Sequence, residues 1–146
     1  MLKTDEKEKM KFIVCYDDTE LSKDVVREAQ KHADRWEATL EIAKVVRRET
    51  PIKRTRLLEM EAELESEVKG LFKGMNVPYN VQLDVDDIHV GEKIVELAGV
   101  MEAELIFLGI KKHSKVGKLL FGSTAQYIIL NAACPVVTVN KFKAEP

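Results

Sequence analysis

Residues 105–139 limit what this chain can fold into, because they contain all the parts of one parallel crossover unit. The stretch begins with a short apolar run that ends at Gly109, and residues 110–118 follow as a basic segment without periodicity. Apolar residues at helical spacing come after Gly122, and a β-branched run starts at Val136. Strand, loop, helix and strand in this order place the loop at the carboxyl edge of a sheet, where open α/β sheets bind ligands.

The rest of the chain alternates in the same way between strand-like and helix-like segments. The predicted strands are residues 11–16, 38–46, 79–85, 105–109 and 136–140, and the predicted helices are 21–36, 51–72, 90–101 and a segment from 122. This alternation predicts an α/β fold with a doubly wound, five-stranded parallel sheet. We expect residues 1–10 to be a charged tail and residues 11–146 to form a single domain.

Composition excludes several classes of protein. A chain of 146 residues, 45% hydrophobic and 33% charged, suits one globular domain. The net charge of −2 gives no electrostatic reason to expect nucleic acid or an anionic membrane as a partner, and no apolar run is long enough to span a bilayer. Cys15 and Cys134 lack the spacing of a redox pair, and no apolar signal region is present, so we expect a cytoplasmic protein with reduced thiols.

Positive charge is nevertheless concentrated in the basic segment. Beside it, Gly122, Ser123 and Thr124 open a helix, and free backbone N–H groups and hydroxyls at a helix start suit phosphate. The alternative is that the basic residues only keep an exposed loop soluble. A Walker motif is excluded, because Leu119 stands where it needs a hydroxyl. The basic side chains are Lys111, Lys112, His113, Lys115 and Lys118.

Asp17 directly follows the first predicted strand. Its simplest role is to cap the next helix or to form a turn. In a parallel sheet, however, the end of this strand lies beside the end of the strand that closes at Gly109, so Asp17 would face Gly109 across a cleft. We therefore expect Asp17 to belong to the ligand site.

The spacing from Gly109 to Gly122 and Ser123 resembles the nucleotide-binding signature of the universal stress protein family. That signature is glycine, two residues, glycine, nine residues, glycine and then serine or threonine. Lys112 stands at the second glycine, so this copy departs from the pattern. The resemblance extends over residues 11–140 and includes Cys134-Pro135 before the last strand. It implies a flavodoxin-like fold, similar to the adenine-nucleotide alpha hydrolases, with strand order 3-2-1-4-5.

The resemblance also implies a ligand and its contacts. The expected ligand is ATP, or AMP or ADP, with Mg²⁺ as the accompanying metal. Asp17 would contact the nucleotide and the metal, and the main chain of Val45 would meet the adenine ring. The phosphates would lie against Gly109, Gly122, Ser123 and Thr124, with Lys111 or Lys112 supplying charge. No catalytic residue is predicted, and we expect at most slow ATP hydrolysis or autophosphorylation.

Lys112 leaves two outcomes open. If the family glycine uses positive φ, a lysine there costs about 1–2 kcal/mol, and its Cβ would also crowd a phosphate. The loop could instead take another path, with the ammonium group replacing the lost contact. The alternative function is accordingly a signalling or interaction module of the same fold that works without nucleotide.

Three smaller predictions complete the sequence analysis. We interpret the acidic residues at 84, 86 and 87 as solvated turn residues, with a metal site as the alternative, and His89 as a surface or helix-cap residue. The last strand has no proline or charge before Lys141, which leaves a sheet edge open to pairing. We expect a homodimer through this strand, as the family resemblance implies; in the alternative, residues 141–143 fold over the edge and the chain stays monomeric.

Overall fold

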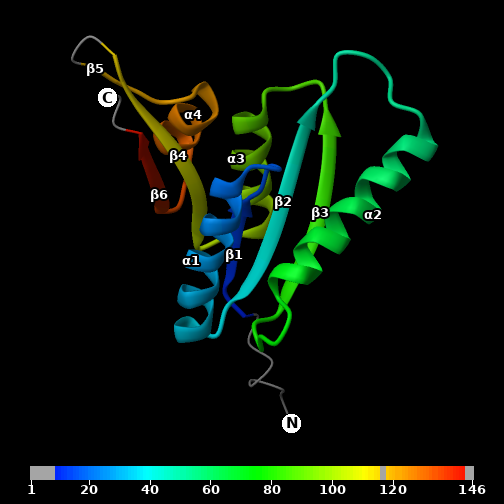
Figure 1. Ribbon diagram of the computed structural model, residues 1–146, viewed down its shortest axis with the longest axis horizontal. Coiled ribbons are helices and arrows are strands. Elements are labelled where there is room, and N and C mark those ends of the chain that lie inside the picture. Colours follow the sequence, from blue (N-terminus) through cyan, green and yellow to red (C-terminus); the bar gives the residue numbers. More distant parts are fainter. Residues whose placement is uncertain (1–8, 116–117, 144–146) are drawn as a thin grey trace.

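The computed structural model describes residues 9–115 and 118–143, with side chains throughout these ranges except at 112–120 and 141–143. Strands and helices alternate along the chain (Figure 1). In chain order they are β1 (Lys11–Cys15), α1 (Glu20–Trp36), β2 (Thr39–Arg47), α2 (Arg54–Leu71), β3 (Tyr79–Asp86), α3 (Val90–Met101), β4 (Leu105–Lys115), β5 (Lys118–Leu120), α4 (Ser123–Asn131) and β6 (Val136–Lys143).

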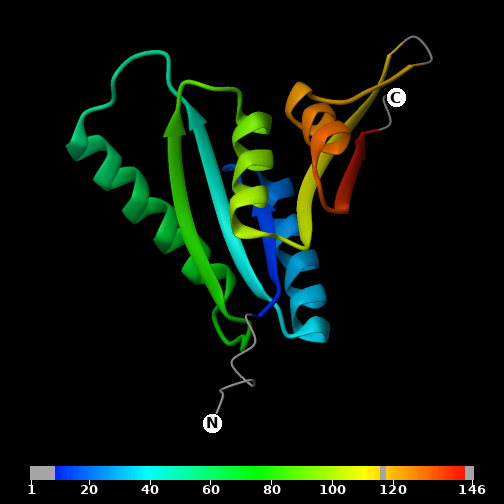
Figure 2. The ribbon, with the colours of Figure 1, turned by 180° about the vertical axis from the view of Figure 1, so that it is seen from behind.

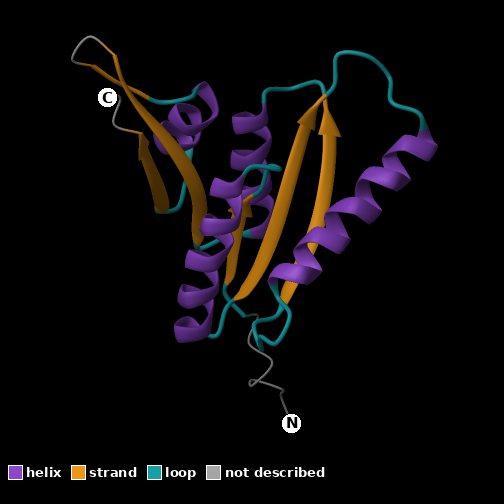
Figure 3. Cartoon of the chain, in the orientation of Figure 1, coloured by secondary structure: helices purple, strands orange, loops and turns teal. Residues whose placement is uncertain are grey.

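The sheet has five parallel strands in the order β3-β2-β1-β4-β6, which confirms the predicted 3-2-1-4-5 arrangement. The additional short strand β5 pairs antiparallel with the end of β4. Helices α1 and α2 cover one face of the sheet, and α3 and α4 cover the other (Figures 1 and 2). The carboxyl ends of the parallel strands therefore meet along one edge between two helical layers (Figure 3).

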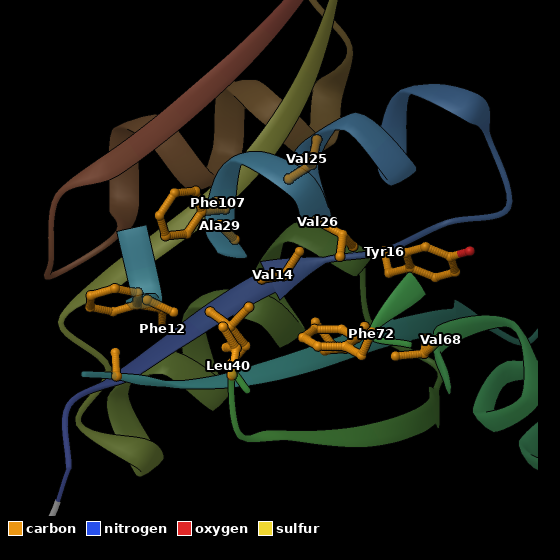
Figure 4. Close-up of a cluster of buried hydrophobic side chains, with 14 of the residues drawn as sticks. Phe12, Val14, Tyr16, Val25, Val26, Ala29, Leu40, Val68, Phe72 and Phe107 are labelled. Atoms are coloured by element: carbon orange, nitrogen blue, oxygen red, sulfur yellow. The ribbon is translucent and has the colours of Figure 1, made fainter. Parts of the chain in front are cut away.

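Two apolar layers hold this arrangement together. The layer on the α1 side joins Phe12, Val14 and Leu40 of the strands to Val25 and Ala29 of α1 (Figure 4). A second layer on the α3 side is formed by these buried residues: Ile13, Ala43, Ile94, Ala98, Ile106, Leu108, Ile110, Ala125 and Ile128. Since β1 and β4 are covered on both faces, their near-continuous apolar sequences are explained.

The basic segment differs from its prediction. We expected a loop over residues 110–118, whereas β4 continues to Lys115 and turns into β5. His113 pairs with Leu120 of β5 on one side and with Lys143 of β6 on the other. The predicted loop was wrong because β6 offers a backbone partner along the whole of residues 106–113, and ladder hydrogen bonds do not depend on apolar periodicity.

Residues 141–143 also differ from one of our alternatives. They continue β6 and pair with Lys111, Lys112 and His113 of β4. The possibility that they fold over the sheet edge was therefore wrong. The predicted tail at residues 1–10 lies largely outside the described residues, so it stays a prediction.

Candidate functional site

A cavity of about 590 Å³ opens at the carboxyl edge of the sheet. Its apolar lining comes from the ends of β1, β2 and β4 and from the start of α3, with Cys15, Val45, Val90, Ile94 and Leu108 among the lining residues. The polar part of the lining includes Asp17, Thr19, Ser22, Lys111 and Thr124. The cavity thus combines an apolar wall with a few convergent polar groups, as small-molecule sites commonly do.

Asp17 is held by a turn between β1 and α1. Its Oδ1 accepts hydrogen bonds from the Thr19 backbone N–H at 2.9 Å, from the Thr19 hydroxyl, and from the Ser22 hydroxyl at 2.6 Å. The Asp17 N–H in turn donates to Ser22 Oγ at 2.9 Å. No described group donates to the second carboxylate oxygen, Oδ2. One oxygen of Asp17 is therefore fixed by the chain, and the other remains able to accept a hydrogen bond or a metal.

The charge state of Asp17 follows from the same contacts. Partial burial acts to raise its pKa, but the hydrogen bonds from Ser22 and Thr19 and the positive charge of Lys111 together lower the pKa below the ordinary value of 3.8. Asp17 is consequently a carboxylate at neutral pH, which suits ribose hydroxyls or a divalent cation.

The main chain of Val45 points to the open side of β2. Both backbone polar groups of a strand residue, N–H and C=O, point to the same side of the strand, and successive residues point to opposite sides. The Ala43 carbonyl accepts a hydrogen bond from Tyr16 N–H at 2.9 Å, so the Ala43 groups face β1. The groups of Val45, two residues further along, face the same side, where the ladder with β1 has already ended at Cys15. In the described residues the Val45 groups therefore lack a β1 partner on that side, and their contact with adenine stays a prediction.

Packing constrains only one of the two motif glycines that the sequence retains. A Cβ at Gly109 would lie 2.8 Å from Leu21 Cγ and 3.0 Å from Val25 Cγ2, so glycine allows α1 to pack closely on β4. A Cβ at Gly122 would meet no described atom within 4 Å. Packing within the chain therefore requires glycine at position 109 but gives no reason for it at position 122.

Helix α4 begins at the cavity without a side-chain cap. Its N-cap residue is Gly122, and no described side chain accepts from the first backbone N–H groups, whereas Thr19 caps α1 and His89 caps α3. Uncapped N–H groups and the positive end of the helix dipole favour an anion. Gly122 and Thr124 line the cavity, whereas Ser123 is not among its lining residues and its hydroxyl instead contacts His89.

The two candidate lysines are placed differently. Lys111 is exposed and lines the cavity, and its positive charge helps to lower the pKa of Asp17. The backbone of Lys112 lies in β4, paired with Phe142, and its side chain lies outside what the structure describes. Lys111 is thus the lysine whose charge the structure brings to the cavity.

Sequence reasoning missed two contacts around Asp17. Ser22 is 4% exposed and bonds both the backbone and the carboxylate of Asp17. A hydroxyl five residues after an acidic turn residue was the available signal. Lys44 of β2 pairs with Asp18 at 2.7 Å, which neutralises a carboxylate beside the cavity. This second contact joins residues 26 positions apart, so no local pattern could have indicated it.

The described residues contain no group of three or more His, Cys, Asp or Glu side chains placed to hold a metal ion. We interpreted the acids at 84, 86 and 87 as solvated turn residues, but Asp84 and Asp86 lie half-buried in β3, and only Asp87 is exposed in the turn that follows. Asp86 pairs with Lys93, and Asp87 pairs with Arg48. Among the described residues that line the cavity, Asp17 is the one carboxylate that could bind a metal. Mg²⁺ is commonly bound by one or two carboxylates together with phosphate oxygens and water, so Asp17 fits Mg²⁺ only alongside a phosphate-bearing ligand.

Cys15 is the last residue of β1 and lines the cavity, but its thiol is unreactive at neutral pH. Burial, together with the charge of Asp17, raises the pKa of its thiol to about 12. The thiol therefore stays protonated at neutral pH and is a poor nucleophile. Cys15 and Cys134 are both free cysteines, as expected.

The sequence profile described as the universal stress protein family matches residues 10–140. The chain belongs to the universal stress protein family. A curated universal stress protein from Mycolicibacterium smegmatis is 32% identical over 74 residues, which is 51% of this chain and 56% of that protein. Another, from Methanocaldococcus jannaschii, is 42% identical over 53 residues, or 36% of this chain and 31% of that protein. This universal stress protein thus aligns with little more than half of one curated relative and about a third of the other.

Solved structures agree with the family. A universal stress protein from Archaeoglobus fulgidus has a TM-score of 0.75 and 26% identity, covering 88% of this chain and 97% of that one. An Archaeoglobus fulgidus universal stress protein in complex with dAMP has a TM-score of 0.69 and 21% identity, over 88% of this chain and 96% of that one. A universal stress protein in complex with cAMP has a TM-score of 0.68 and 20% identity, over 90% and 97%. At these identities the two complexes establish the shared fold.

None of the described helices is both long enough and apolar enough to cross a membrane.

Proposed function

We propose that this universal stress protein binds an adenine nucleotide at the carboxyl edge of its sheet. The observation that carries the proposal is that one cavity brings together three complementary groups. They are the free Oδ2 of Asp17, the outward main chain of Val45, and the uncapped start of α4. Each suits a different part of a nucleotide, and the family members solved with dAMP and cAMP support this class of ligand.

The parts of the nucleotide follow from the chemistry of the lining. Adenine would lie against the apolar wall and exchange hydrogen bonds with the main chain of Val45. The ribose hydroxyls, or Mg²⁺ on the phosphates, would meet Asp17 Oδ2. The phosphates would lie at the start of α4, near Gly122, Ser123 and Thr124, with Lys111 supplying positive charge.

We propose ATP with Mg²⁺ as the ligand, since a triphosphate makes the fullest use of α4 and Lys111; AMP and ADP are the other candidates. The proposal includes no rapid turnover, and slow hydrolysis or autophosphorylation is the most we expect. In this proposal the protein acts in the cytoplasm as a stress-type regulator whose state depends on nucleotide.

Calorimetry with ATP and Mg²⁺ tests the proposal. We expect saturable binding in the natural chain and weaker binding in Lys111→Gln, by about threefold to tenfold for one lost charged contact. Lys31→Gln is the matched control, because it also replaces one exposed lysine with glutamine: the Lys31 side chain is 74% exposed on α1. Absence of binding at millimolar ATP would refute the proposal, and equal loss in both variants would place the ligand elsewhere.

One observation favours a second function, a signalling or interaction module that works without nucleotide. Lys112 stands where the motif has glycine, and its backbone pairs in β4, so the loop expected around the phosphates is replaced by a β4–β5 hairpin. This module would be purified without bound nucleotide, and its melting temperature would not respond to ATP. Stoichiometric AMP or ATP released from denatured protein, measured by chromatography, would exclude it.

We also propose that the chain forms a homodimer through β6. This strand pairs with β4 on one side, and neither a second strand nor a helix is paired to its other edge in the described part of the chain. Beside it, Ile129 and Leu130 of α4 are 45% and 80% exposed. Antiparallel pairing of two β6 strands would satisfy both edges around one two-fold axis.

Sedimentation at tens of micromolar tests the dimer. We expect the natural chain to sediment as a dimer and Thr138→Pro to shift it toward monomer, because the Thr138 N–H faces the open edge of β6 and proline removes that donor. Val81→Pro in β3 serves as a control for damage to the sheet in general. A monomeric natural chain would refute the dimer.

A further inference from the structure

His89 connects the starts of two helices at the cavity. As the N-cap of α3, its Nδ1 lies 3.1 Å from the Gly91 backbone nitrogen. Its other ring nitrogen, Nε2, lies 3.3 Å from Ser123 Oγ, in the first turn of α4. The ring also packs against Tyr127 of α4, with 6.2 Å between ring centroids. One imidazole therefore contacts two of the three helices whose N-terminal turns border the cavity, α3 and α4.

The cap determines the tautomer of this imidazole. A backbone N–H can only donate, so His89 Nδ1 must carry a lone pair to accept from Gly91. In the neutral ring the proton then sits on Nε2, and Nε2–H donates to Ser123 Oγ. Ser123 accepts this bond with its oxygen, which leaves its hydroxyl hydrogen free to donate to an anion.

The two helices approach closely enough to make this contact because position 91 is glycine. A Cβ at Gly91 would lie 2.9 Å from Tyr127 Cβ and 3.2 Å from His89 Nδ1. Such contacts are shorter than side chains accept, so any larger residue would push α4 or the His89 ring away. The cluster of His89, Gly91, Ser123 and Tyr127 is thus packed to a single arrangement.

We infer that His89 is a positioning residue for the phosphate end of the nucleotide site. It fixes the first turn of α4 against α3 and orients the Ser123 hydroxyl as a donor. The inference rests on the proposed function, because it assumes that a phosphate meets the start of α4. It also predicts that Ser123 is not a phosphoryl acceptor activated by His89, since a protonated Nε2 cannot remove the serine proton.

Binding of ATP and of adenosine by four proteins tests the inference: the natural chain, His89→Asn, Ser123→Ala and the double variant. Asparagine is a strong N-cap residue and carries no charge, but its shorter side chain cannot cap α3 and also reach Ser123. We expect His89→Asn to weaken ATP binding by about threefold to tenfold, which is the effect of one lost hydrogen bond. Its affinity for adenosine and its melting temperature should be unchanged. Ser123→Ala should do the same, and the double variant should be no weaker than either single one.

A spectroscopic measurement separates this role from simple capping. In long-range ¹H–¹⁵N spectra, His89 is expected as the Nε2–H tautomer, with its signals assigned by their loss in His89→Asn. The Nδ1–H tautomer, equal weakening of adenosine and ATP, or additive effects in the double variant would each overturn the inference. If the natural chain binds neither ligand, the proposed function fails. If the natural chain binds both ligands and His89→Asn binds them equally well, only the proposed role of His89 fails.

Discussion

The two sides of the cavity differ in how completely the chain satisfies its own polar groups. On the β1 side, Asp17 Oδ1 accepts three hydrogen bonds, Thr19 caps α1, and Lys44 pairs with Asp18. On the α4 side, no described side chain caps the helix, and Lys111 is exposed. A Cβ at Gly122 would meet no described atom within 4 Å. Folding therefore fixes one side of the cavity, and the other side keeps groups that a ligand could satisfy.

This difference separates two contributions to binding. A prearranged carboxylate provides selectivity at little cost in ordering, because its position does not change when the ligand enters. Uncapped N–H groups and an exposed ammonium supply favourable energy only when an anion arrives. Changes on the β1 side should thus affect stability together with binding, and changes on the α4 side should affect binding with little effect on stability.

The largest expected effect comes from placing the same substitution at the two motif glycines. Gly109→Ser should lower the free energy of unfolding by about 1–3 kcal/mol, because its Cβ would collide with Leu21 and Val25. Gly122→Ser should leave stability within about 0.5 kcal/mol of the natural chain, since serine is a good N-cap. Gly122→Ser should nevertheless weaken ATP binding, because the serine hydroxyl would compete with the phosphate for the same N–H groups.

Urea denaturation and calorimetry on both glycine variants measure these effects. A Gly109→Ser protein as stable as the natural chain would show that α1 can move away from β4 at no cost. That result would remove the distinction between the two glycines.

Asp17→Asn should have the next largest effect. It keeps an acceptor at Oδ1 but removes the charge that strengthens three hydrogen bonds, which should cost about 1–2 kcal/mol of stability near neutral pH. The pKa of Asp17 in the folded protein lies below 3.8, so its stabilisation is fully present above about pH 4. It is lost as the pH falls through the folded-state pKa.

Denaturation of the natural chain and of Asp17→Asn across the acid range tests this dependence. The difference in stability between the two proteins should shrink as the pH falls below 4. A difference that stays constant would mean that the Asp17 hydrogen bonds do not depend on its charge.

Ser22→Ala should cost about 1 kcal/mol, because it removes both a donor to Asp17 Oδ1 and the acceptor for the Asp17 N–H. Nucleotide affinity should fall together with stability, since the Asp17 carboxylate loses the hydrogen bond that the Ser22 hydroxyl donates. Ser66→Ala on exposed α2 is the matched control and should change neither quantity. Lost stability with unchanged affinity would separate the Asp17 turn from the ligand site.

The smallest effect is expected for Lys44→Met, which removes the ion pair with Asp18. Because the Asp18 side chain is 60% exposed, the pair should contribute only about 0.2–1 kcal/mol to stability. Affinity for ATP should fall slightly, since an unpaired Asp18 would repel phosphate, and added salt should reduce the difference. A salt-independent loss would point to changed packing of β2 instead.

The sequence alone determined the alternation of strands and helices, the limits of most helices to within a few residues, and the edge at which a site would form, whereas the strand order came from the family resemblance. These features depend on local periodicity and on the handedness of parallel crossovers, both of which a single chain carries in its pattern of apolar residues. The predicted helix at residues 90–101 matches α3 residue for residue. The presence of Asp17 and Lys111 beside one cavity was likewise expected from strand ends alone.

The tertiary structure decided the rest, and it did so through contacts between distant residues. β4 extends to Lys115 because β6 pairs with it as far as His113 and β5 pairs with residues 113–115, and the sequence of this segment does not indicate either pairing. Gly109 is required by Leu21, and His89 acquires a second contact only because Gly91 allows α4 to approach. Local sequence sets which backbone conformations are favourable, but the partners that satisfy hydrogen bonds and fill space come from elsewhere in the chain.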